Sequence, residues 1–61
     1  MDRYSYAIQE LCLSGKISLG CASRSTVYRW AREINERLER EKADWRVKAD
    51  PRTNAIEAVA V

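Results

Sequence analysis

The chain has 61 residues, enough for one small domain. A chain of this length buries only about 60% of the surface that its unfolded form exposes. This length excludes a self-contained metabolic enzyme, which needs a walled pocket, and favours a binding module. The 11 Lys and Arg residues against 9 Asp and Glu give a net charge of +2, and 46% of the residues are apolar. That composition is typical of a folded chain and not of a disordered one.

The first predicted element is a helix from Asp2 to about Ser14. The carboxylate of Asp2 can cap its N-terminus, and Gly15 is a natural stop at its C-terminus. Its apolar side chains recur at helical spacing and are Tyr4, Ala7, Ile8, Leu11 and Cys12. The segment 16–22 that follows is compatible with a short helix, a turn or a three-residue strand around residues 17–19.

The strongest helical pattern begins at Ser23. Ser23 or Ser25 can cap the first turn, and neither Gly nor Pro interrupts the chain before Pro51. We therefore expect a long helix that ends between Glu41 and Val47. Its apolar side consists of Val27, Trp30, Ala31, Ile34 and Leu38.

The C-terminal part of the chain carries weaker patterns. Residues 50–54 are typical of a loop, and the apolar segment 55–61 can be a short strand, a helical turn or a flexible end. We expect an all-α fold with a short helix, an irregular turn and a long helix, to which a minor C-terminal strand or a flexible tail is added. Residues 1–50 then form the helical domain, and residues 51–61 form a loop and an apolar tail.

The long helix can also mediate self-association. Beyond Leu38 its apolar side continues through Glu41 to Trp45 in alternating steps of three and four residues, which is the spacing of a coiled coil. We therefore expect a homodimer. The expected dimer contact consists of Ile34, Leu38 and Trp45.

Unmatched positive charge is concentrated at the start of the long helix. Residues 1–30 hold four Lys or Arg against two acids, a surplus of two, whereas residues 31–50 hold six of each. Opposite charges in the later stretch fall one helical turn apart, as in Glu36 and Arg40, so that surface neutralises itself. The surplus lies in Arg24 and Arg29, with Arg32 one turn further along the helix.

The same turns carry groups that suit DNA. A helix N-terminus offers backbone N–H groups to phosphate, Arg offers a bidentate fork to guanine, and Ser or Thr can bond phosphate or a base edge. The run from Ala22 to Trp30 (ASRSTVYRW) resembles the turn and recognition helix of helix-turn-helix proteins. The similarity is to the homeodomain-like and excisionase-like small regulators of phages and other mobile elements.

This resemblance implies both a core and a DNA-contact surface. Val27 and Trp30 would be core positions, and the start of the long helix would enter the major groove. Upstream, either the helix 4–14 is the first helix of the motif, followed by a long turn, or the connection contains a small strand. The DNA-contact residues would be Arg24, Ser25, Thr26, Tyr28 and Arg29, to which the charge distribution adds Arg32.

No cofactor or metal is expected. Two cysteines without any histidine cannot complete a four-ligand zinc site, and we expect Cys12 and Cys21 to be reduced thiols. No catalytic constellation and no apolar window long enough to span a membrane is recognisable in the sequence. We therefore expect a protein that is not an enzyme and that has no membrane partner. Because no secretion signal is recognisable either, we expect a cytoplasmic location in a bacterial cell or a phage-infected host.

Two functions remain. The first is a sequence-specific transcriptional regulator of the phage or mobile-element type that binds double-stranded DNA. The alternative is a small helical adaptor or inhibitor that binds another protein, such as a host protein, through its apolar stripe and C-terminal tail.

Overall fold

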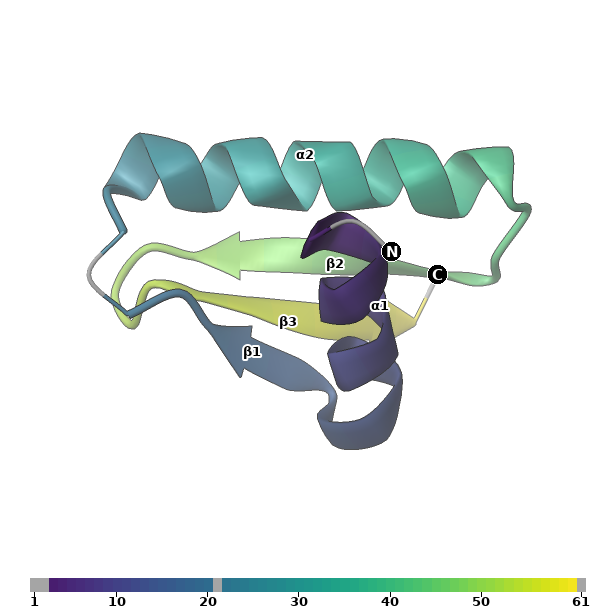
Figure 1. Cartoon of the computed structure of the whole chain (residues 1–61), viewed down its shortest axis with the longest axis horizontal. Helices are drawn as coiled ribbons and strands as arrows, with labels where there is room; N and C mark the ends of the chain where they lie inside the picture. The colour runs from purple at the N-terminus through teal and green to yellow at the C-terminus, as the bar shows by residue number, and fades with distance from the viewer. Residues whose placement is uncertain (1–2, 21, 61) are drawn as a thin grey trace.

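The computed structural model describes residues 3–20 and 22–60, in which two helices pack against one three-stranded antiparallel sheet (Figure 1). The expected N-cap Asp2, the thiol of Cys21 and the last residue lie outside the described residues. The elements in chain order are α1 (Arg3–Ser14), β1 (Lys16–Ser18), α2 (Arg24–Arg40), β2 (Trp45–Asp50) and β3 (Ala55–Ala60).

The fold is mixed α/β, so the expected all-α class is wrong. The last strand, β3, is central in the sheet: it pairs with β1 through Ile17↔Ile56 and with β2 through Val47↔Ala58. The segment that follows α1 is therefore a strand, and so is most of the apolar tail. The boundary expected after residue 50 falls within the hairpin that joins β2 to β3.

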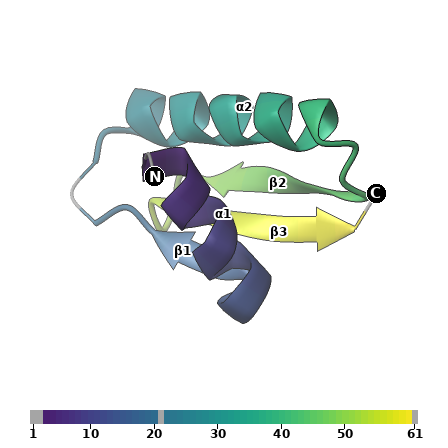
Figure 2. The same ribbon diagram turned by 45° about the vertical axis from the view of Figure 1, so that its right-hand side comes forward.

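The two long strands follow the period of two that a sheet with one covered face requires. Val47 and Ile56 are buried under the helices, whereas the neighbouring Lys48 and Glu57 are exposed on the other face and lie opposite each other. The burial thus alternates between the two faces at the centre of both strands, although Ala55 beside Ile56 is buried as well, and the helices cover one side of the sheet (Figure 2).

Helix α2 begins as expected and ends earlier than expected. Ser23 is its N-cap, with a side-chain oxygen that accepts the N–H of Thr26 at 3.3 Å. At the other end Lys42 adopts a left-handed φ of 58°, and the N–H of Ala43 bonds to the carbonyl of Leu38 at 2.9 Å. This left-handed turn leads the chain into β2, so the last helical residue is Arg40, with Glu41 as the C-cap, one residue before the expected range of 41–47.

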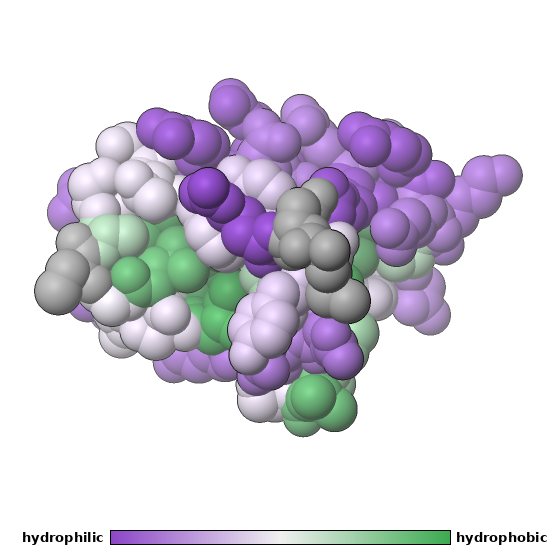
Figure 3. Space-filling view, in the orientation of Figure 1, coloured by the Kyte–Doolittle hydropathy of each residue, from purple (hydrophilic) through white to green (hydrophobic). Residues whose placement is uncertain are grey.

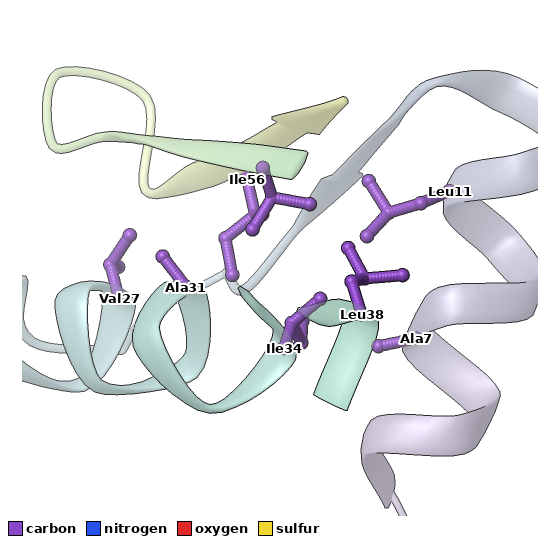
Figure 4. Close-up of a cluster of buried hydrophobic side chains, with 8 residues drawn as sticks. Ala7, Leu11, Val27, Ala31, Ile34, Leu38 and Ile56 are labelled. Atoms are coloured by element: carbon purple, nitrogen blue, oxygen red, sulfur yellow. The ribbon is translucent and has the colours of Figure 1, made fainter. Parts of the chain in front are cut away.

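The core lies between the helices and the sheet (Figure 4). Ile34 and Leu38, two of the three expected dimer contacts, are only 0% and 1% exposed because they pack against α1 and the sheet of their own chain. Trp45, the third, is not on a helix at all: it is the half-buried first residue of β2. These three residues therefore form no common helical surface for a second copy. The largest fully buried side chains are Leu11, Ile34, Leu38, Ile56 and Val27.

Candidate nucleic-acid interface

The exposed side of the first half of α2 carries a shallow hollow of about 380 Å³. Its positions follow the spacing i, i+3, i+4 and i+7, which places them along one face of the helix, away from the buried Val27 and Ala31. The residues that line the hollow are Ser25, Tyr28, Arg29 and Arg32.

The hollow is positively charged and open to solvent. Residues 22–32 contain no Asp or Glu, and the nearest acids on α2 are Glu33 and Glu36, one helical turn beyond Arg29 and Arg32. The side chain of Tyr28, which lines the same hollow, is 50% exposed, although large aromatic rings usually bury more of their surface. The upper surface formed by α2 is largely hydrophilic (Figure 3). This surface therefore offers two guanidinium forks, a phenol and a hydroxyl to a ligand.

The two remaining predicted contact residues are placed differently. Arg24 is exposed in the first turn of α2, next to the hollow. Thr26 is half-buried, and its hydroxyl lies 2.9 Å from the Oγ of Ser23, which in turn lies 3.2 Å from the Oγ of Ser25. Thr26 thus belongs to the hydroxyl network of the N-cap, and its side chain helps to fix the start of the helix.

The β2–β3 hairpin loop lies at the same end of the molecule as the start of α2 (Figures 1 and 2). Asn54 holds it there: the side-chain amide donates to the carbonyls of Gly20 at 3.0 Å and Ala22 at 2.9 Å. The carbonyl of Asn54 accepts the N–H of Leu19 at 2.8 Å. These bonds tie the loop to the turn that leads into α2, so loop and helix are positioned as one unit.

This loop adds a residue that the sequence reasoning missed. Arg52 is exposed at the hairpin tip, where the carboxylate of Asp50 accepts its backbone N–H at 3.1 Å. Lys48 is exposed on β2 before the loop. A signal was present in the sequence: the apolar positions 45, 47 and 49 alternate before a four-residue loop that contains Pro, which is typical of a hairpin.

Trp30 fulfils the structural role expected for it. It is half-buried, packs against the core, and meets the ring of Tyr4 on α1 edge-to-face, with the ring centroids 5.0 Å apart. This aromatic pair connects α1 to the start of α2 and so helps to fix the orientation of the arginine-bearing face. Trp30 is therefore a support for the hollow and not a lining residue of it.

The described part of the chain contains no group of three or more acidic or Cys side chains placed to hold a metal ion. None of the helices described is long and apolar enough to cross a bilayer. Comparisons of the chain with models of known families, with curated proteins and with solved structures gave no match.

Proposed function

We propose that the protein binds double-stranded DNA with the exposed face of α2 in the major groove and acts as a transcriptional regulator of the phage or mobile-element type. The observation that supports this most is the hollow, because four of the six residues expected to contact DNA line it together. We also propose that it acts in the cytoplasm of a bacterial cell or an infected host.

The dimensions and chemistry of α2 fit this role. The major groove is about 12 Å wide and admits one α-helix, whose exposed side chains then reach base edges. Arg29 and Arg32 can each donate two parallel hydrogen bonds to guanine or bind phosphate, and the hydroxyls of Ser25 and Tyr28 can bind phosphate or a base edge. The opposite side of α2 is anchored in the core by Ile34 and Leu38, so the helix is presented on a rigid support.

The hairpin loop supports the same orientation. If the start of α2 enters the groove, the loop held beside it by Asn54 is carried toward the adjoining sugar-phosphate backbone. Arg52 at its tip then supplies a further cation for phosphate. Asp50 is the acid nearest to Arg52 in the sequence, and its carboxylate is engaged by the loop backbone.

The test is a fluorescence-anisotropy titration of labelled duplexes with variants of matched charge change. Arg29→Ala and Arg32→Ala each remove one cation from the hollow, whereas Arg40→Ala removes one from the last turn of the same helix. A lost bidentate base contact costs about 1–3 kcal/mol, so each hollow variant should bind its best duplex roughly ten-fold or more weakly.

Arg40→Ala should bind within about two-fold of the wild type, because a surface charge outside the contact adds little. Circular dichroism of all three variants establishes that α2 is intact. Equal losses in the three variants would contradict the proposed orientation, and no binding of any duplex by the wild type would contradict the function.

A second candidate, the binding of another protein, is supported by a different surface. An apolar hollow of about 560 Å³ lies between α1, β1 and the start of α2, and Figure 3 shows it as the green area between the two helices. Its apolar lining comes from Tyr6, Ala7, Ile17, Leu19 and Trp30. The apolar stripe and tail first expected to bind a partner are instead used inside the fold.

A further inference from the structure

Strand β2 forms an edge of the sheet, because the strand order is β1-β3-β2. It is six residues long, whereas β1 at the other edge has three. An edge strand presents a row of N–H and C=O groups that another chain can pair with, and proteins usually block such edges. The longer edge of this sheet therefore needs a blocking element.

Asn35 on α2 occupies the middle of that edge. Its Nδ2 donates to the carbonyl of Val47 at 3.1 Å, and its Oδ1 accepts the N–H of Val47 at 2.8 Å. A residue on a neighbouring antiparallel strand makes this same pair of bonds. The amide of Asn35 thus takes the place of a fourth strand at one position.

These bonds also fix which groups of β2 face the open side. The N–H and C=O of Val47 point away from β3, and in an antiparallel strand the direction alternates, so Trp45 and Ala49 face the open side as well. The carbonyl of Trp45 is itself occupied, since Nη1 of Arg46 donates to it at 2.7 Å. The outward-facing groups are therefore arranged symmetrically about Val47, with Asn35 at the centre.

We propose that Asn35 masks a strand-pairing site for a second copy of this chain. Two β2 strands related by a two-fold axis at Val47 pair Val47 with Val47 and Trp45 with Ala49. The carbonyl of Trp45 then accepts the N–H of Ala49 on its second lone pair, beside Arg46, so every outward-facing group has a partner and the two sheets join into one. Asn35 competes directly with this pairing, because it holds the N–H and C=O at the axis. The proposal is independent of DNA binding.

The first test compares Asn35→Ala with Glu36→Ala by sedimentation equilibrium. Glu36 is exposed on α2, so its variant controls for a change in the helix itself. Asn35→Ala should raise the apparent mass from 7.0 kDa toward twice that value, while the wild type and Glu36→Ala show the same mass as each other. Identical masses for all three up to near-millimolar concentration would overturn the proposal.

A double variant and an exchange measurement locate the effect. Asn35→Ala combined with Ala49→Pro should lose the added association, because Pro removes an outward-facing donor of β2. Association that persists in the double variant would place the contact elsewhere and overturn the proposal.

In the wild-type protein, the amide of Val47 should exchange with solvent more slowly than that of Ala49. Equal exchange rates would show that Asn35 does not mask the edge, and this result decides the question even if Asn35→Ala does not fold.

Discussion

Substitutions at Ile34 and Leu38 separate a core role from a role in dimer contact. Both side chains are fully covered by their own chain, in contact with α1 and the sheet. Removing one methylene by Ile34→Val should cost about 0.5–1.5 kcal/mol, and Leu38→Ala about 2–5 kcal/mol including the cavity that it leaves. A 61-residue domain has a total free energy of unfolding of only roughly 3–9 kcal/mol, so Leu38→Ala should remove about half of it and lower the Tm much further than Ile34→Val does.

The loss of stability in these variants is measured by thermal unfolding, followed by circular dichroism at two well-separated protein concentrations. A domain of this size loses roughly 4–8 °C of Tm per kcal/mol, so Ile34→Val should melt several degrees below the wild type. The loss should be the same at both concentrations, because the contacts are made within one chain. The exposed Glu36→Ala is the control and should change Tm little. An Ile34→Val variant with an unchanged Tm and weakened self-association would refute the core assignment and restore the dimer contact.

Three further changes test the caps and the loop tether. Ser23→Ala should lower the free energy of unfolding by about 0.5–2 kcal/mol in a urea titration, because it removes the N-cap acceptor of α2, and an unchanged midpoint would argue against that cap. Lys42→Gly should raise the free energy of unfolding in the urea titration by up to about 1 kcal/mol, since Gly adopts the left-handed φ of 58° without steric cost; a lower value would contradict the left-handed turn at the end of α2. Asn54→Ala removes two hydrogen bonds to backbone carbonyls and places Ala at a left-handed φ of 50°, so it should cost about 1–3 kcal/mol, and it should weaken duplex binding more than Thr53→Ala does. Equal affinities of these two loop variants in the anisotropy assay would show that the tether does not position a DNA contact.

The start of α2 could be predicted from the sequence because its signals are local. Ser23 is a strong N-cap residue, and Val27, Ala31 and Ile34 repeat at helical spacing with a large contrast to the charged positions between them. The same spacing places the side chains of the hollow on one outward face of the helix. The helical spacing alone was therefore sufficient to predict that Arg29 and Arg32 lie on the same face of α2.

The end of α2 and the sheet could not be predicted in the same way. The helix stops without Gly or Pro, through a left-handed Lys42, and charged residues that favour a helix continue past the stop. Two local signs indicated that the helix does not continue: Glu41 interrupts the apolar spacing before Trp45, and the apolar positions 45, 47 and 49 alternate as in a strand. The strand β3 is central because the distant strand β1 pairs with it on the side opposite its hairpin partner β2, and such long-range pairing leaves little trace in a short apolar run.

The contribution of Asn35 and Asn54 was invisible for a related reason. Each amide acts on backbone groups far along the chain: Asn35 bonds to Val47, and Asn54 bonds to Gly20 and Ala22. The sequence shows only that these residues are polar. Their half-buried positions and their backbone partners become evident when the fold is known.

The salt dependence of duplex binding by the unmodified protein tests the central claim most directly. Arg24, Arg29 and Arg32 are exposed on the first half of α2, and Arg52 is exposed in the hairpin loop near the start of that helix. Each phosphate neutralised by such a cation releases counterions from DNA. If Arg24 and Arg52 engage phosphates, and Arg29 and Arg32 engage either bases or phosphates, the logarithm of the binding constant should fall against the logarithm of salt concentration with a slope of about −4 to −2. Tight binding at low salt that declines with this slope is the result that we predict. Binding that does not change between about 50 and 200 mM salt, or no saturable binding at the lower concentration, would contradict a DNA-binding function.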